Sequence, residues 1–281
     1  MNGKDRKVRI GGVPEHFNVP WRMDGVAVQF SEVREGSGAM LKGLAEGTYD
    51  GIVALTECVV AKAYEDQQCS DIKIIGTYVA SELIWGVHVG GKTEFESLEQ
   101  LRGKRFGVSR MGSGSHVMAA VMAKDRGWSE GLEFVVIGGF SQLRDAVNSG
   151  VCDVFMWEKF MTKPFHDSGE VRTIGEVPTP WPCFVLACKK DNPAQEELKG
   201  ALQKALQCAK SFKLNEGEKS VSFIVETYGL ARGDASQWLQ AVRYADPLSI
   251  AMEEEHLLSA FTALKSAGVI AKNSEFDDRL R

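Results

Sequence analysis

The chain has 281 residues, of which 44% are hydrophobic and 25% charged, an ordinary composition for a globular protein of one or two domains. Its net charge is -5 and no basic stripe or RNA-type motif stands out, so nothing favours nucleic acid as a partner. No apolar run approaches the roughly 18 residues of a membrane span, and no apolar segment of signal-peptide type follows the charged N-terminus.

Apolar runs bounded by turn residues predict strands, and amphipathic periodicity predicts helices. Apart from two strands near the N-terminus and those of an internal repeat, the predicted strands lie at 71–79, 83–89, 105–109, 133–138, 171–176 and 183–188. The predicted helices outside the repeat lie at 95–102, 114–126, 194–213, 216–228, 235–243 and 253–267. Because strands alternate with helices, we expect an α/β fold with a mainly parallel sheet and a helical C-terminal segment.

An internal repeat predicts two similar lobes. Residues 40–57, "MLKGLAEGTYDGIVALTE", align with residues 143–159, "LRDAVNSGVCDVFMWEK", at an offset of 103. Each copy reads as a short amphipathic helix, a glycine at its C-cap, a turn with an aspartate and an apolar strand. The matched glycines and aspartates are Gly47 with Gly150, and Asp50 with Asp153. No low-complexity linker is present, so we expect strands to join the lobes.

The first predicted strand ends in a dense cluster of functional side chains. Glu15, His16, Phe17, Asn18 and Trp21 lie within seven residues, in a segment that contains Pro20 and follows Pro14. In open α/β sheets, ligands bind just beyond the carboxyl ends of the strands, so this cluster indicates a binding site. The alternative is a surface turn held by an aromatic contact.

A second candidate site is the stretch "SRMGSGS", residues 109–115, between a predicted strand and a predicted helix. Small residues let a ligand approach the backbone, and the free N–H groups and positive dipole end of a helix attract an anion. Ser109, Ser113 and Ser115 add hydroxyl donors; simple capping of the helix by Ser113 or Ser115 is the alternative. The literal P-loop pattern at 86–93 continues a strand and lacks a following acidic strand end for Mg²⁺, which argues against a nucleotide site.

Tryptophans and glutamates recur at predicted strand ends. The second copy of the repeat ends in Trp157 and Glu158, and "TPWPCF" places Trp181 between two prolines. Aromatic walls with a few polar groups are typical of a small-molecule cleft, although a single tryptophan is usually part of the core. Glu15, Glu57 and Glu158 are candidates for a carboxylate pair, but their spacing does not show that they converge. No Ser-His-Asp order, HExxH or GxSxG motif is present.

The cysteines show no CxxC and no zinc-type spacing. They are Cys58, Cys69, Cys152, Cys183, Cys188 and Cys208. This usage predicts buried thiols in a reducing, cytoplasmic setting, without a metal site. A mature secreted form whose signal has been removed is the alternative.

Several stretches together resemble one superfamily over nearly the whole chain. They are "GVPEHFN", "GSGAMLKGLAEGTYDGIVALTE", "GTYVASELIWGV", "GVSRMGSGSHVMA", "DVFMWEKF", "GEVPTPWP" and the helical C-terminal segment. The chain resembles the type II periplasmic-binding-protein superfamily, in the branch of nitrate-, sulfonate- and taurine-binding proteins and thiamine-pyrimidine synthases. Within it, the chain is most similar to a signal-less, largely fungal subfamily of solute-binding-protein-like proteins.

The resemblance implies two α/β lobes, joined by two crossing strands, with a ligand held between them. Lobe one would comprise 1–90 plus 185–281 and lobe two 91–184, with hinge strands near 84–90 and 183–189. The resemblance places the following residues in the cleft: Glu15, His16, Phe17, Thr56, Glu57, Ser81, Ser109, Met111, Gly112, Ser113, Gly114, Ser115, Trp157, Glu158 and Trp181. In this arrangement "PEHF" forms the lip of lobe one and faces "RMGSGS" on lobe two.

The chain departs from its relatives in two respects. Only a short segment separates Trp21 from the next predicted strand, so the usual first helix is shortened or absent. The thiamine-pyrimidine synthases carry a dense cysteine run for iron and a lysine for the cofactor, whereas this chain has only Cys183 and Cys188 in the first region and no lysine within 50–57. We therefore expect no cofactor: neither stoichiometric iron nor a lysine aldimine with pyridoxal phosphate.

Three functions remain open from the sequence. The first is non-catalytic binding of a small anionic or zwitterionic molecule between the lobes. The second is an enzyme of thiamine-pyrimidine-synthase type, or another small-molecule enzyme that uses Glu15 and His16. The third is the substrate-binding component of an ABC transporter. The sequence does not determine the ligand or the oligomeric state.

Overall fold

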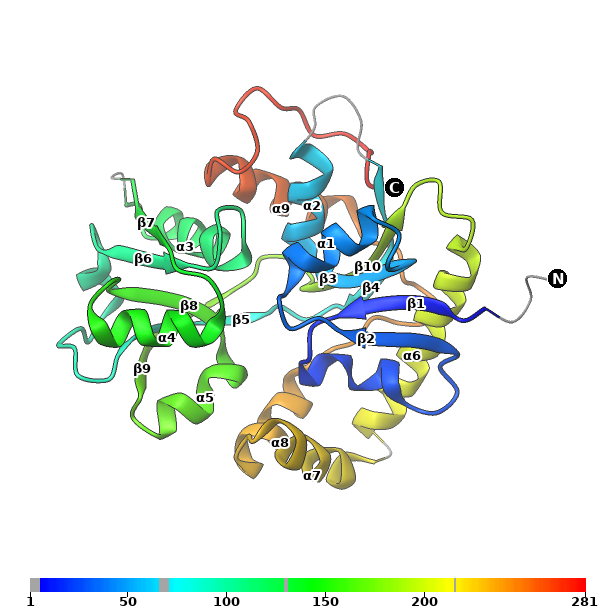
Figure 1. Ribbon diagram of the computed structural model, residues 1–281, viewed down its shortest axis with the longest axis horizontal. Coiled ribbons are helices and arrows are strands. Elements are labelled where there is room, and N and C mark those ends of the chain that lie inside the picture. Colours follow the sequence, from blue (N-terminus) through cyan, green and yellow to red (C-terminus); the bar gives the residue numbers. More distant parts are fainter. Residues whose placement is uncertain (1–5, 66–70, 129–130, 215) are drawn as a thin grey trace.

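The computed structural model describes residues 6–65, 71–128, 131–214 and 216–281, which form two lobes with one five-stranded sheet each (Figure 1). The sheet of lobe one has the order β2-β1-β3-β10-β4 and consists of β1 (Val8–Gly12), β2 (Val28–Glu32), β3 (Gly51–Leu55), β4 (Ile72–Val79) and β10 (Phe184–Lys189). The sheet of lobe two has the order β7-β6-β8-β5-β9 and consists of β5 (Ile84–Gly90), β6 (Arg105–Val108), β7 (Glu133–Val136), β8 (Val154–Glu158) and β9 (Val171–Pro178). The α/β fold class is confirmed.

Helices cover both sheets. Lobe one carries α1 (Ser37–Ala45), α2 (Thr56–Glu65), α6 (Gln195–Leu214), α7 (Gly217–Tyr228), α8 (Arg232–Ala241) and α9 (Glu254–Ser266). Lobe two carries α3 (Gly114–Asp125), α4 (Phe140–Ser149) and α5 (Lys159–Asp167). No helix in the described ranges is both long and apolar enough to cross a membrane.

Both sheets are mainly parallel, as expected, but each contains one reversed strand. In lobe one, β2, β1 and β3 are parallel, but β10 is antiparallel to β3 and β4. In lobe two, β7, β6 and β8 are parallel, but β5 is antiparallel to β8 and β9. The reversed strand in each sheet is the one by which the chain arrives from the other lobe. It enters at the edge where the parallel strands end, and it therefore runs in the opposite direction.

The chain crosses between the lobes at 80–83 and again at 179–183. The strand at 84–90 pairs within the sheet of lobe two, so the first crossing lies before the predicted boundary at residues 90 and 91. The two crossings are hydrogen-bonded to each other: the Thr179 N–H donates to the Leu83 carbonyl, and the Leu83 N–H donates to the Thr179 hydroxyl, each over 3.0 Å. The connection is therefore a short, paired ribbon.

The internal repeat is explained by a pair of equivalent ion pairs. In lobe one, the backbone N, Nε and Nη2 of Arg9 donate to the carboxylate of Asp50 over 2.8, 3.1 and 2.8 Å. In lobe two, the same three atoms of Arg105 donate to Asp153 over 2.8, 3.0 and 2.9 Å. Each aspartate thus ties the turn after a helix to the neighbouring parallel strand, which requires the same helix, glycine, turn and strand spacing in both lobes.

Two segments form short 3-10 helices, and one of them was predicted as a full helix. The segment 95–102 contains only η2 (Leu98–Leu101), which the left-handed Gly103 (φ +71°) follows. After β1, η1 (His16–Arg22) replaces a full helix, in agreement with the shortened spacing. The hydroxyls of Tyr78 and Tyr244 both donate to the Phe17 carbonyl, over 2.7 and 3.1 Å, and hold η1 against the core of lobe one.

We predict that Asp50→Ala lowers the free energy of unfolding by about 1–3 kcal/mol, because several charge-assisted hydrogen bonds are lost from a side chain that is mostly buried. Urea denaturation measures the change. Asp153→Ala should act in the same direction through lobe two, whereas the exposed Glu226→Ala should stay within about 0.5 kcal/mol. An unchanged stability of Asp50→Ala would show that the repeated pair does not stabilise the fold.

Candidate functional site

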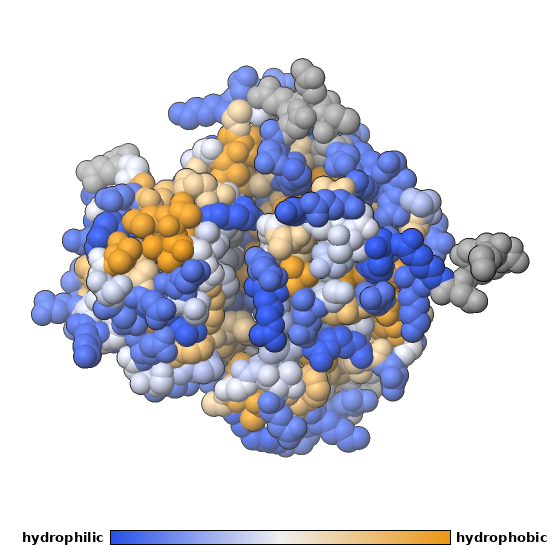
Figure 2. Space-filling model, in the orientation of Figure 1, coloured by the Kyte–Doolittle hydropathy of each residue, from blue (hydrophilic) through white to orange (hydrophobic). Residues whose placement is uncertain are grey.

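A cleft of about 720 Å³ lies between the two lobes. Figure 2 shows hydrophilic side chains along the boundary of the lobes on this face. The lining comes from the loops after β1, β2, β3, β6, β7 and β8, with further residues from the crossings. Five helices, α1 to α5, begin at these same loops. The cleft thus lies at the carboxyl ends of the parallel strands of both sheets, where N–H groups at helix starts face a ligand.

The start of α3 has an unusual arrangement of serines. The hydroxyl of Ser113 donates to the Arg110 carbonyl over 2.7 Å and lies 3.0 Å from the hydroxyl of Ser115. Ser115 in turn accepts a hydrogen bond from the Ser109 N–H over 3.3 Å. Ser113 is the N-cap residue but makes no side-chain capping bond, so the serines brace the loop instead of capping the helix. The N–H groups of 114–116 lie in the first turn of α3 and have no hydrogen-bond partner within the helix, and Gly114 and Ser115 line the cleft.

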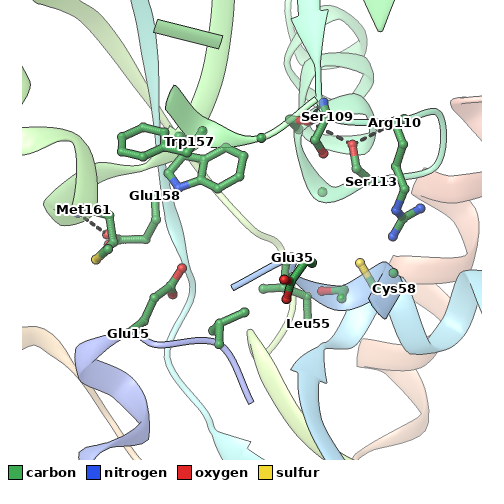
Figure 3. Close-up of a pocket in the computed structure, with 18 of the residues that line it drawn as sticks. Glu15, Glu35, Leu55, Cys58, Ser109, Arg110, Ser113, Trp157, Glu158 and Met161 are labelled. Atoms are coloured by element: carbon green, nitrogen blue, oxygen red, sulfur yellow. Dashed lines mark hydrogen bonds between the residues drawn. The ribbon is translucent and has the colours of Figure 1, made fainter. Parts of the chain in front are cut away.

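Arg110 is a cleft residue that sequence analysis missed. It extends from lobe two to lobe one, because a Cβ atom placed on Gly38 would lie 3.1 Å from its Nε (Figure 3). Its charge also lies close enough to the thiol of Cys58 in α2 to influence the pKa of that thiol. A guanidinium therefore stands between the starts of α1 and α3, where it adds to the positive potential of both. A basic side chain directly after a predicted strand was the signal that could have identified it.

Glu15 and Glu158 face each other on another side of the cleft, one from each lobe (Figure 3). Oε2 of Glu158 accepts a hydrogen bond from the Met161 N–H over 2.6 Å and caps α5. Burial raises the pKa of Glu15 to about 7. Burial, and then the negative charge of Glu15, raise the pKa of Glu158 to about 8. Beside them, Trp157 stacks on Phe140 with ring centroids 5.1 Å apart and forms a flat wall.

The structure brings together about half of the residues that the resemblance placed in the cleft. Those that line it are Glu15, Ser109, Ser113, Gly114, Ser115, Trp157 and Glu158. Those that do not line it are His16, Phe17, Thr56, Glu57, Ser81, Met111, Gly112 and Trp181. Lining residues that sequence analysis did not single out include Arg34, Glu35, Ser37, Cys58, Trp85, Arg110, Phe140 and Met161.

Most of the residues outside the cleft have structural roles. His16 is fully buried between Phe17 and Trp238, and burial lowers its pKa to about 3. In the lip "PEHF", Glu15 therefore lines the cleft, whereas the side chains of His16 and Phe17 point into the core. Glu15 faces Glu158 rather than "RMGSGS" (Figure 3). Thr56 donates to a carbonyl of the second crossing. Ser81 accepts the N–H of Arg243, and Met111 is 53% exposed to solvent.

Glu57 and Trp181 form a buried pair behind the cleft. The indole Nε1 of Trp181 donates to Oε2 of Glu57 over 2.9 Å. The other carboxyl oxygen, Oε1, has no hydrogen-bond partner among the described residues. Burial raises the pKa of Glu57 to about 7, against the smaller opposing effect of its hydrogen bonds. Oε1 lies beside Gly114, so this carboxyl group of lobe one packs against the start of α3 in lobe two.

Gly114 is enclosed by side chains of both lobes. A Cβ atom at this position would lie 2.7 Å from the Trp85 ring and 3.0 Å from Oε1 of Glu57. A larger side chain at this position would collide with Trp85 and Glu57 instead of projecting into the cleft.

The described residues offer little to a metal ion. Glu253, Glu255 and His256, at the start of α9, are the one group of possible ligands in the described ranges, and they lie at the surface away from the cleft. The cysteines that the structure describes are buried and free: Cys58, Cys152, Cys183, Cys188 and Cys208. Cys69 lies outside the described residues.

The sequence and the fold are both similar to those of known proteins. Residues 85–177 match the family model described as Ca3427-like PBP. The CA3427 gene product of Candida albicans, which is described as defining a new family with the generic periplasmic binding protein fold, is 28% identical, with a TM-score of 0.84 over 98% of this chain and 93% of that chain. No curated protein matches the sequence significantly.

More distant solved structures share the fold. The alkanesulfonate-binding protein SsuA from Xanthomonas axonopodis pv. citri, bound to MOPS, is 14% identical, with a TM-score of 0.71 over 98% of this chain and 95% of that chain. The periplasmic aliphatic sulphonate-binding protein SsuA from Escherichia coli is 15% identical, with a TM-score of 0.67 over 95% and 92%. The resemblance to periplasmic-binding-protein-like proteins and the two-lobed fold are confirmed.

We predict that the protein loses stability as the pH rises from about 5 to 8. The pKa of Glu57 is higher in the folded protein than in the unfolded chain, so its contribution is complete below about pH 4.5 and is lost as the pH rises through about 7. At about 1.4 kcal/mol per pKa unit, this residue contributes at most about 3.5 kcal/mol. Glu57→Gln cannot ionise but retains an acceptor for Trp181, so urea denaturation should show a weaker pH dependence.

The exposed Glu82→Gln is the matched control and should reproduce the pH dependence of the parent protein. Equal slopes of stability against pH for the parent and Glu57→Gln would contradict the role given to Glu57.

We also predict that Gly114→Ala destabilises the protein, because its Cβ would clash with Trp85. Gly139→Ala is the matched control in the same cleft. Its φ of -72° suits alanine, and the added Cβ would make an ordinary contact of 3.6 Å with Gln142. Thermal unfolding of both variants measures the difference. A melting temperature of Gly114→Ala equal to that of Gly139→Ala would disprove the close packing of Gly114.

Proposed function

Starting from the periplasmic binding protein fold of this chain, we propose that it is a non-catalytic binding protein that holds a small anionic or zwitterionic molecule between its lobes. The observation that carries the proposal is the start of α3, where open N–H groups, braced serines and Arg110 face the cleft. Hydrogen bonds to a charged group contribute about 1.5–3 kcal/mol each. Several of them suffice for micromolar affinity after the losses of association.

The solved structures with a similar fold support an acidic group on the ligand. Two of them are named for binding sulfonates, and one of these is bound to MOPS, which carries a sulfonate. A sulfonate presents three acceptor oxygens, which suit the N–H groups of 114–116 and the guanidinium of Arg110. We extend this ligand class to the present chain because both features line its cleft.

Closure of the lobes is the event that we expect a ligand to stabilise. Helix α5 of lobe two already contacts α8 of lobe one, with Lys163 Nζ 3.4 Å from the Asp234 carboxylate. Phe160 of α5 meets the ring of His16 edge-on, at 6.5 Å between centroids. A ligand that bridges both walls adds further contacts between the two lobes.

The enzymatic alternative finds less support in the geometry. His16, which that hypothesis pairs with Glu15, lies in the aromatic core and not in the cleft. The segment 50–57 provides no lysine, and Cys183 and Cys188 are fully buried. We therefore propose binding without resident iron or pyridoxal phosphate. A role as the binding component of a transporter would use the same cleft. A cytoplasmic location follows from the cysteine usage and stays an expectation.

We predict that propane-1-sulfonate binds in the cleft and that Arg110→Gln weakens this binding about 10- to 100-fold, the effect of losing charge-assisted hydrogen bonds. Isothermal titration calorimetry measures both affinities. Lys92→Gln removes a positive charge at an exposed site outside the cleft and should bind like the parent protein. Equal affinities of the parent and Arg110→Gln, or no binding of sulfonate, sulfate or phosphate at millimolar concentration, would disprove the proposed anion site.

A further inference from the structure

The cleft has two chemically opposite ends. Figure 3 shows Ser109, Arg110 and Ser113 at one end, and Glu15 and Glu158 at another. On the basis of the proposed function, we infer that the ligand is a zwitterion whose anionic group binds at the start of α3 and whose ammonium group lies between the Glu15 and Glu158 carboxyls. The anion site alone does not require this second group, so the two ends can be tested separately.

The two carboxyls approach from different lobes. Glu15 follows β1 of lobe one, and Glu158 is the last residue of β8 in lobe two. Their charges interact, since the negative charge of Glu15 raises the pKa of Glu158. Two buried carboxylates whose charges interact repel each other, so without a counter-charge they retain protons. An ammonium group between them would relieve the repulsion and would bind both lobes at once.

None of the ion pairs found among the described residues includes Glu15 or Glu158. Lys159, next in the chain to Glu158, pairs instead with Glu176 over 2.8 Å, and its charge has the smallest effect on the Glu158 pKa. The other titratable groups whose charges interact with Glu15 or Glu158 are the hydroxyl of Tyr228 and the thiol of Cys183. Neither carries a positive charge, and the adjacent imidazole of His16 is neutral at physiological pH because burial lowers its pKa.

Aromatic side chains line the cleft beside the two carboxyls. Trp85 lies directly opposite Glu158 in the antiparallel pair of β5 and β8, so both side chains share one face of the sheet, and Trp85 lines the cleft. Trp157, the residue before Glu158, also lines the cleft, and an indole face attracts an ammonium group.

The probes are two matched pairs of compounds: 3-aminopropane-1-sulfonate with propane-1-sulfonate, and 4-aminobutane-1-sulfonate with butane-1-sulfonate. Calorimetry at pH 7 should show that at least one amine binds tenfold or more tightly than its partner compound. Titration in two buffers of different ionisation enthalpy should show that this amine releases more protons than its partner, because the ammonium displaces protons from the carboxyls.

Glu158→Gln keeps an amide oxygen that can cap α5 at the Met161 N–H but cannot ionise. In this variant the preference for the amine and the additional proton release should both disappear, while the alkanesulfonates should bind as before. Glu15→Gln is the second variant, on the opposite lobe, and should reduce the preference in the same way. Thermal unfolding at pH 7 confirms that each variant is folded.

If the alkanesulfonates bind as tightly as the amines at both chain lengths, the inference of a cationic ligand group is wrong and the proposed anion site stands. A preference that survives in both variants also overturns the inference, since the ammonium would then bind elsewhere. If none of the four compounds binds, the proposed anion site fails and the inference fails with it.

Discussion

The architecture depends on one constraint: the chain must cross between the lobes twice at the edge where the parallel strands end. Each arriving strand, β5 or β10, enters its sheet from that edge and runs against its neighbours. The crossings also hold the two sheets so that the edges at which their parallel strands end face each other. Loops that would cover the top of a single sheet thereby become the two walls of a cleft, and the starts of α1 to α5 lie along it.

The same geometry determines the electrostatics of the site. Helix starts from both lobes and Arg110 make one end of the cleft positive. At another end, Glu15 and Glu158 are held in a position that disfavours their charged form. Burial also disfavours the charged form of Glu57, which lies behind the wall of the cleft. Carboxyls that water does not stabilise respond strongly to any cation that enters, whereas surface carboxyls do not.

Sequence patterns predicted those parts of the structure that local spacing determines. The two lobes followed from the repeat, because the Arg9–Asp50 pair and its counterpart demand the same spacing twice. The reversed direction of β5 and β10 was not predictable, since the crossings determine it and no local sequence pattern reveals a crossing. Strand ends were recognisable, so Glu15 and Glu158 were found. Whether the next side chain faces the cleft or the core depends on tertiary packing, which is why His16 and Trp181 were misplaced.

In the proposed mode of binding, a single ligand spans both ends of the cleft. A crystal structure of the protein grown with 3-aminopropane-1-sulfonate or 4-aminobutane-1-sulfonate tests this most directly. We predict sulfonate oxygens within hydrogen-bond distance of the N–H groups of 114–116 and of Arg110, and the nitrogen between Glu15 and Glu158. A sulfonate bound away from the start of α3, or a nitrogen directed into solvent, would contradict it.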